Sequence, residues 1–217
     1  MSAIAREATD IARWKHQLES GISAMGIRLH DTQTEKLLQF VFLIEKWNRV
    51  HNLTAIRDME KMISHHVLDS LAILPYITGK RILDVGSGAG LPGIPLAITQ
   101  PDIEVTLIDS NSKKSAFQQQ ARADLQLDNV QSICTRVEAW HADPYDTIVS
   151  RAYSELTTFI EFSRHLLADQ GTFVAMKGAF PQEEIAVLPA SFRVRQSHRL
   201  EVPGLQAERH LILIEKS

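Results

Sequence analysis

The spacing of apolar positions changes near residue 80 and divides the chain into two parts. Before this point, apolar side chains recur at helical spacing in three segments, residues 3–25, 32–50 and 58–77. After it, short apolar runs alternate with helical segments, a pattern typical of a parallel sheet with helices on both faces. The sequence therefore predicts an N-terminal helical cap, residues 1–78, followed by an α/β domain, residues 79–217.

Seven runs in the second part have the length and composition of strands. Five of them alternate with helical segments and lie at residues 81–85, 103–109, 130–135, 146–150 and 171–176. The last two, residues 192–202 and 209–215, follow each other without a long helix between them. We expect a mostly parallel, seven-stranded sheet that ends in an antiparallel hairpin.

Local motifs predict where several helices begin. Thr32 and Glu35 stand at capping-box spacing, and Asp58 and Ser112 precede helical runs as N-cap residues do. Pro92 suits the first turn of the helix after the first strand, where its missing N–H costs nothing.

Residues 81–98 combine a strand, a glycine-rich loop and the start of a helix. An apolar run that ends at Val85 is typical of a strand buried on both faces. Gly86, Gly88 and Gly90 follow, and glycines allow positive φ angles and the close approach of a ligand to the main chain. This arrangement predicts a nucleotide-type site at the carboxyl end of the first strand.

Two cofactors fit this loop. Residues 88–93 match the dinucleotide pattern G-x-G-x-x-G, but Gly86 and Ser87 separate that match from the strand. Residues 84–90 resemble motif I of the class I S-adenosylmethionine (SAM) methyltransferases, whose loop wraps the amino-acid part of SAM. Asp109, at the end of the second strand, can accept both ribose hydroxyls of either cofactor. The closing hairpin resembles the antiparallel pair of the class I methyltransferase sheet, and it favours SAM.

Composition limits the classes of partner. The 217 residues are 44% hydrophobic and 23% charged, which is ordinary for a globular protein. A net charge of −3 does not support a broadly basic nucleic-acid binder, so an RNA site must be a local patch. The single cysteine, Cys134, lies in an apolar run and is predicted to be a buried structural thiol. No apolar run is long enough to span a membrane, and the first residues lack a signal-peptide core, so we expect a cytoplasmic protein.

Further motifs, spread along most of the chain, point to one family of SAM methyltransferases. The matching runs are Trp47-Asn48, Asn52-Leu53-Thr54, His66-Val-Leu-Asp69-Ser70, residues 84–95, Asp109-Ser110, Lys113-Lys114, Phe117, Arg136-Val137-Glu138, Ser150-Arg151-Ala152, Lys177-Gly178 and Glu208-Arg209-His210. In this order they resemble the 16S ribosomal RNA guanine-N7 methyltransferases of the small subunit, the RsmG or glucose-inhibited division protein B family. The resemblance covers roughly residues 25–216.

This resemblance implies transfer of a methyl group from SAM to N7 of one guanine, nucleotide 527 of the 530 loop in 16S rRNA. The implied partner is 16S rRNA or the 30S subunit, and we expect a monomer. The resemblance also implies the residues that contact the cofactor: Asp84, Gly86, Gly88, Gly90, Leu91, Asp109, Ser110, Val137, Glu138 and Arg151.

The chemistry of N7 requires little of the protein. N7 has an in-plane lone pair and no proton to lose, so catalysis consists of positioning and exclusion of water. We therefore assign no catalytic residue and name Arg151 and Lys177 as candidates for positioning. The candidates for RNA contacts are Asn52, His66, Lys114, Arg136, Lys177 and Arg209.

His65, His66 and Asp69 also suggest a metal site, but they converge only partly and no further His or Cys lies at ligand spacing. We expect no metal and a hydrogen bond along the helix face instead. Two alternative functions stay open: a nicotinamide-dependent oxidoreductase, whose Tyr-Lys or His-Asp apparatus has no counterpart here, and a non-catalytic RNA-binding module.

Overall fold

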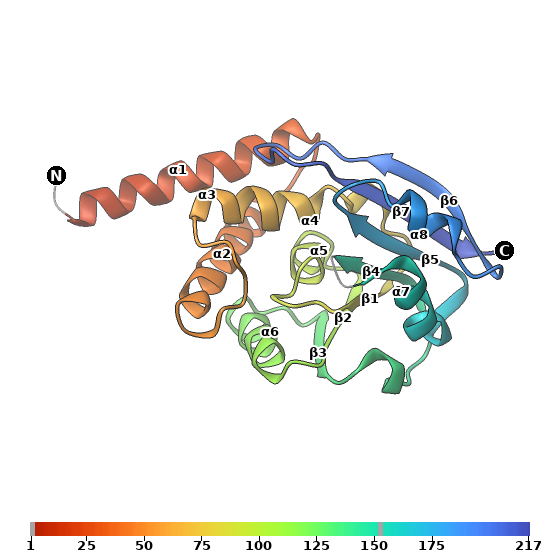
Figure 1. Cartoon of the computed structure of the whole chain (residues 1–217). Coiled ribbons are helices and arrows are strands. Elements are labelled where there is room, and N and C mark those ends of the chain that lie inside the picture. The colour runs from red at the N-terminus through yellow and green to blue at the C-terminus, as the bar shows by residue number, and fades with distance from the viewer. Residues whose placement is uncertain (1–2, 152–153) are drawn as a thin grey trace.

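The computed structural model describes residues 3–151 and 154–217, and the side chains only from residue 8 onward. Ala152, the last residue of one motif above, lies outside the described residues. Seven strands form one sheet in the order β3-β2-β1-β4-β5-β7-β6 (Figure 1). Their bounds are β1 (Arg81–Val85), β2 (Glu104–Asp109), β3 (Val130–Cys134), β4 (Tyr145–Arg151), β5 (Leu167–Lys177), β6 (Phe192–Arg199) and β7 (His210–Lys216).

The sheet has the predicted topology. β1 to β5 run parallel, and β7 pairs antiparallel with both β5 and β6. The chain leaves β1 toward β2 and β3 on one side and returns to β4 on the other, so β1 and β4 flank the switch point where ligands bind in open α/β sheets. β5 begins four residues earlier than predicted, because Leu167 pairs with Tyr145 across an irregular register.

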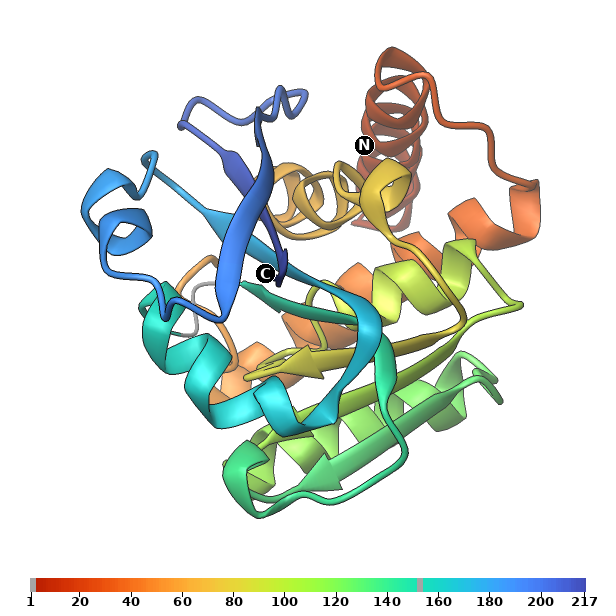
Figure 2. The same ribbon diagram turned by 90° about the vertical axis from the view of Figure 1, so that its right-hand side faces the viewer.

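Helices cover both faces of the sheet (Figure 2). One hydrophobic cluster contains residues of α5 (Gly93–Thr99) and α6 (Ser112–Asp124), and a second contains residues of α7 (Leu156–Ser163). The remaining short helices of the α/β part are η3 (Val137–Ala139), η4 (Arg164–Leu166) and α8 (Gln182–Ala186).

The N-terminal segment forms the predicted helical cap. It contains α1 (Ala3–Ala24), α2 (Asp31–His51), α3 (Met59–Met62), the π-helix η1 (Ile63–Leu68), α4 (Asp69–Leu71) and η2 (Leu74–Tyr76). Leu37, Phe40 and Ile44 of α2 belong to the same cluster as Phe117 of α6, and the rings of Phe40 and Phe117 lie 6.2 Å apart. Because cap and sheet share this core, the boundary at residue 78 stays a prediction.

Two predicted caps are wrong and one is confirmed. α2 begins at Asp31, and His30 precedes it, with its N–H donating to Oε1 of Gln33 at 3.0 Å. α6 is capped by Asn111, whose Oδ1 accepts from the N–H groups of Lys113 and Lys114. Ser112 is already helical, so its backbone N–H and C=O belong to the first turn. Asp58 caps α3 as predicted, because its Oδ1 accepts from Lys61 N at 2.8 Å.

Cys134 is exposed, contrary to the prediction of a buried thiol. Its strand, β3, is at the edge of the sheet, where a strand is covered incompletely. Within the described residues, no helix has the length and apolar character needed to cross a membrane.

Candidate functional site

The glycine loop follows β1 directly and turns tightly. Gly86, Gly88 and Gly90 have φ angles of 67°, 56° and 74°, a region that L side chains rarely adopt. The N–H groups of Gly86 and Ser87 donate to the carbonyl of Ile108 on β2, which fixes the loop to the neighbouring strand. The sequence therefore uses glycine here because the backbone conformation requires it.

Asp84 lies beneath this loop and organises it from inside the protein. Its Oδ2 accepts from the N–H of Gly93 at 2.8 Å, which ties the end of β1 to the first residue of α5. Its Oδ1 is buried without a hydrogen-bond partner among the described residues. Burial raises the pKa of this carboxyl from 3.8 to about 7, and the Gly93 hydrogen bond and nearby Arg151 oppose that rise only in part.

Asp109, at the end of β2, holds the loop from the other side. Its Oδ2 accepts from Gly88 N at 2.9 Å, and its Oδ1 accepts from Asn111 N at 2.9 Å. Lys114 Nζ lies 3.6 Å from Oδ2. Each carboxylate oxygen accepts one backbone hydrogen bond and retains capacity for another, so Asp109 can still receive two hydroxyl donors.

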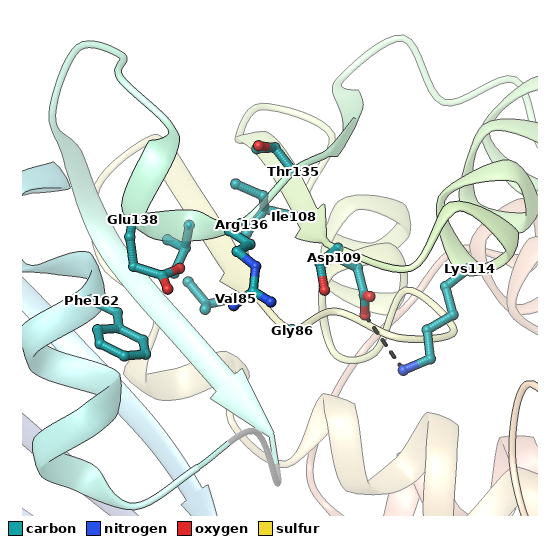
Figure 3. Close-up of a pocket in the computed structure, with 11 residues that line it drawn as sticks. Val85, Gly86, Ile108, Asp109, Lys114, Thr135, Arg136, Glu138 and Phe162 are labelled. Carbon is teal, nitrogen blue, oxygen red and sulfur yellow. Dashed lines mark ion pairs between the residues drawn. The ribbon is translucent and has the colours of Figure 1, made fainter.

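These elements surround a pocket of about 310 Å³ at the carboxyl ends of β1, β2 and β3 (Figure 3). Five of the ten predicted cofactor residues line it: Gly86, Asp109, Ser110, Val137 and Glu138. The other five are outside its described lining: Asp84, Gly88, Gly90, Leu91 and Arg151. Asp84 and Gly88 instead shape the loop, through the hydrogen bonds described above.

Two residues predicted to contact RNA line this pocket as well. Lys114 pairs with Asp109, and Arg136 extends from the segment after β3 (Figure 3). The Arg136 guanidinium has no hydrogen bond or ion pair to any described residue, although Asp109 and Glu138 line the same pocket. The structure thus puts Arg136 at the pocket predicted to hold the cofactor.

Four residues of this lining were not predicted as site residues: Val85, Ile108, Thr135 and Phe162. Phe162 lies on α7 with its side chain 37% exposed, whereas Phe159 on the same helix is buried. The sequence indicates only that Phe162 belongs to a helix with apolar residues. It does not indicate that this helix, α7, lies beside η3 at the pocket.

A second polar group joins the cap to the sheet. Arg151 Nη1 donates to Oδ2 of Asp69 at 3.2 Å and to the carbonyl of His65 at 2.8 Å. Arg209 Nε donates to Oδ1 of the same Asp69 at 2.9 Å. Arg151 and Arg209 were predicted as separate contacts to ligands, and the structure brings them together around one carboxylate.

Lys177, at the end of β5, has its charge paired. Its Nζ lies 2.7 Å from Oε2 of Glu184 and 2.8 Å from the carbonyl of Ser154. The same Glu184 oxygen accepts from Leu156 N, the first residue of α7. Lys177 therefore fixes the start of α7, and any contact of its side chain with RNA would compete with Glu184.

The predicted RNA contacts in the cap differ in exposure. Asn52 is exposed, and its Oδ1 accepts from Arg57 Nη2. His66 is only 4% exposed, with Nε2 3.0 Å from Oγ1 of Thr54 and with Nδ1 buried without a partner among the described residues. Burial, and then the charge of Arg151, lower the pKa of His66 from 6.5 to about 3, so its ring is neutral at physiological pH.

The expected helix-face hydrogen bond between His66 and Asp69 is wrong, because each side chain bonds elsewhere. His66 contacts Thr54, and Asp69 contacts Arg151 and Arg209. Over residues 3–151 and 154–217, no group of three or more His, Cys, Asp or Glu side chains is arranged to hold a metal ion.

The fold and the loop define a class of protein. A seven-stranded sheet whose penultimate position holds an antiparallel β7, together with a glycine loop and an acid at the end of β2, is the class I methyltransferase architecture. Solved structures agree on the fold. TrmN from Thermus thermophilus superposes with a TM-score of 0.57 and 20% identity, over 68% of this chain and 48% of its own. The mitomycin 7-O-methyltransferase MmcR gives a TM-score of 0.63 and 12% identity, over 95% of this chain and 67% of its own.

Sequence relatives identify the family within that class. The model of the family described as "GidB: rRNA small subunit methyltransferase G" matches residues 33–212. Ribosomal RNA small subunit methyltransferase G of Neisseria meningitidis serogroup B is 51% identical over 203 residues, 93% of this chain and 98% of its own. The protein of that name from Methylobacillus flagellatus is 49% identical, over 92% of this chain and 97% of its own. The chain belongs to the rRNA small subunit methyltransferase G family.

Proposed function

We propose that this protein transfers a methyl group from SAM to N7 of a guanine in 16S rRNA, nucleotide 527 of the 530 loop. Family membership supports transfer to small-subunit rRNA, and the pocket beside the glycine loop supports SAM as the methyl donor. The single observation that carries the proposal is Asp109, a carboxylate with spare acceptor capacity at the end of β2, beside the loop of β1. The proposed location is the cytoplasm, where ribosomes are assembled.

The residues of the pocket fit the parts of SAM. Asp109 offers one remaining acceptor site on each oxygen for the two ribose hydroxyls. Val137 offers an apolar contact and Glu138 a carboxylate, which suit the adenine ring and its amino group. Phe162, which lies on the same side of the pocket as Glu138 (Figure 3), adds an aromatic surface of the kind that stacks on a base. Lys114 places its Nζ 3.6 Å from Oδ2 of Asp109, so the two side chains form an ion pair on the wall of the pocket.

The protein's contribution to the reaction is positional. Bound SAM supplies a methyl group on a positively charged sulfur, and guanine N7 supplies the lone pair. No proton is removed, so the site needs no general base. The described residues hold the pocket at the switch point of the sheet and place the cap residue His65 against Arg151 of β4. This contact joins the cap to the carboxyl end of β4, beside the switch point of the sheet.

The acceptor side would recognise a folded RNA. A chain with net charge −3 gains little from unspecific attraction to phosphates, and one guanine must be unstacked to reach the pocket. The 530 loop in an assembled particle presents such a base at lower cost than a duplex does. We therefore propose the cap and the basic residues beside it, Arg151 and Arg209, as the wall that faces the RNA.

The experiment is incubation of the purified protein with radiolabelled SAM and 30S subunits that lack this modification. The proposal expects label in 16S rRNA, and calorimetry should show binding of SAM or its demethylated product but none of NAD. No label in any RNA fraction, with SAM bound normally, would favour the non-catalytic RNA-binding module. Binding of NAD instead would favour the oxidoreductase.

A further inference from the structure

Asp69 is a buried acidic side chain outside the lining of the proposed cofactor pocket. It begins α4, directly after the π-helix η1, and its carboxylate is 1% exposed. A buried carboxylate costs several kcal/mol in lost hydration unless partners restore the interaction. Here Arg209 Nε binds Oδ1 at 2.9 Å and Arg151 Nη1 binds Oδ2 at 3.2 Å.

The two arginines come from distant parts of the chain. Arg151 ends β4, at the switch point of the sheet, and Arg209 directly precedes β7 of the C-terminal hairpin. Asp69 itself belongs to the cap. One carboxylate therefore links the cap, the end of β4 and the segment before β7. The π-helix supports this placement, since the Asp69 N–H reaches back to the carbonyl of Ser64, five residues earlier, as in a widened turn that is frequent at functional sites.

The cluster of Asp69, Arg151 and Arg209 carries a net positive charge and has hydrogen-bond donors that are not used within the cluster. Two guanidinium groups and one carboxylate leave one net positive charge, and the neighbouring His66 is neutral. Arg151 uses Nη1 for both of its bonds, and Arg209 uses Nε and Nη1, the latter toward the carbonyl of Glu208. The Nη2 group of each arginine has no partner among the described residues. The two side chains are 22% and 23% exposed, so solvent or a ligand can reach them.

We propose that Asp69 is a positioning residue: it holds Arg151 and Arg209 as a fixed pair whose free donors receive an anionic group of the substrates. This inference rests on the proposed function. A phosphate of the rRNA beside the target guanine is the ligand that the net positive charge and the exposed donors suit. Because Arg151 is also a candidate contact to the cofactor, one carboxylate then orients groups for both substrates. Asp69 touches neither substrate and acts only through the two arginines.

The test compares Asp69→Asn with Ser70→Ala as a matched control. Ser70 is buried on the same helix, and its Oγ donates to the carbonyl of His66, so its loss perturbs the same helix without touching either arginine. The amide of Asp69→Asn keeps the shape of the side chain but faces one guanidinium with a donor instead of an acceptor. We expect the KM for 30S subunits to rise more than roughly tenfold in Asp69→Asn, with a smaller rise in the Kd of SAM. Ser70→Ala should leave both values near wild type.

A purely structural role would not produce the expected coupling with Arg209. In an Arg209→Gln background, Asp69→Asn should raise the KM for 30S subunits by a much smaller factor than in wild type, because one of the two arginines it positions is already absent. Equal factors in the two backgrounds, or a wild-type KM in folded Asp69→Asn, would overturn the inference.

If Asp69→Asn does not fold, Arg209→Lys decides the question. Lysine keeps the charge but loses the guanidinium fork, so it cannot bind Asp69 and an anion in the same geometry. We expect its KM to resemble that of Arg209→Gln, and a wild-type KM would overturn the inference because charge alone would then suffice. A wild-type protein that methylates no rRNA would reject the proposed function itself, before any variant is compared.

Discussion

The N–H of Gly88 donates to Oδ2 of Asp109 at 2.9 Å, so the acid at the end of β2 holds the glycine loop of β1. Asp109 therefore has two tasks: it fixes the loop and it presents acceptor capacity to the pocket. The shape of the pocket and its polarity depend on the same side chain.

Asp109→Ala should weaken SAM binding by about 1–3 kcal/mol, because hydroxyls in a formed site lose their partner and the loop loses an anchor. Glu104→Ala is the control, since Glu104 is an exposed acid at the other end of the same strand. Titration calorimetry measures both. An unchanged SAM affinity in Asp109→Ala would refute the ribose assignment.

A substitution of Arg136 tests whether this side chain contacts SAM or RNA. Arg136 was expected to hold RNA, but its side chain lines the pocket beside Asp109 and Glu138. We expect Arg136→Gln to weaken SAM binding roughly fivefold, since a planar guanidinium can stack on the adenine ring. The slope of log K for RNA against log salt should stay unchanged, whereas loss of a phosphate contact would reduce it by about one unit. If Arg136→Gln reduces the salt slope of RNA binding but binds SAM with normal affinity, Arg136 contacts RNA and not the cofactor.

The glycine loop is testable with a matched pair of substitutions. Gly90 and Gly26 both have positive φ, 74° and 69°, but a Cβ at Gly90 would collide with the side chain of Ile94, and a Cβ at Gly26 meets nothing within 4 Å. Gly26→Ala should therefore cost only the backbone strain, about 1–2 kcal/mol. Gly90→Ala should cost more in unfolding free energy and should also reduce SAM affinity. Equal losses of stability in urea denaturation, with unchanged SAM binding, would show that the loop tolerates a side chain.

The dependence of stability on pH should contain two opposing contributions. The folded-state pKa of Asp84, about 7, exceeds its ordinary 3.8, so Asp84 lowers the unfolding free energy as pH rises between these values. The folded-state pKa of His66, about 3, lies below its ordinary 6.5, so His66 raises the unfolding free energy as pH rises between those values. Each slope reaches at most about 1.4 kcal/mol per pH unit, and they largely cancel between pH 4 and 6.5.

Substitution of Asp84 should leave only the pH dependence that His66 gives to the unfolding free energy, and substitution of His66 should leave only that of Asp84. Asp84→Asn should become more stable, relative to wild type, as the pH increases from 4 to 7, and His66→Gln should show the opposite trend. Unfolding curves in denaturant, measured at several pH values, give these differences. Parallel pH profiles for wild type and both variants would contradict the account.

The sequence predicted the sheet well because its strands are short, apolar and punctuated by glycine and acidic residues. The loop of residues 86–90 and the acid Asp109 followed from local pattern alone, since backbone conformation and strand ends determine them. Half of the residues predicted to contact the cofactor line the pocket beside this loop, and their role stays a prediction.

Long-range packing explains what the sequence could not predict. Nothing local indicates that Asp69 meets Arg209, 140 positions later, or that Phe162 of α7 faces the segment after β3. Cys134 has the apolar neighbours of a buried strand, but its strand proved to be an edge. Arg136 was assigned by charge, and only the path of the chain shows that it lies at the pocket.

The most direct test of the central claim is to locate the methyl group in the RNA. Unmodified 30S subunits are incubated with the protein and SAM, and the 16S rRNA is cleaved chemically at 7-methylguanosine and sequenced by primer extension. The account predicts one new stop, at guanine 527, that depends on SAM and is absent without the protein. Methylation of another atom or another nucleotide, or no stop while SAM binds normally, would contradict it.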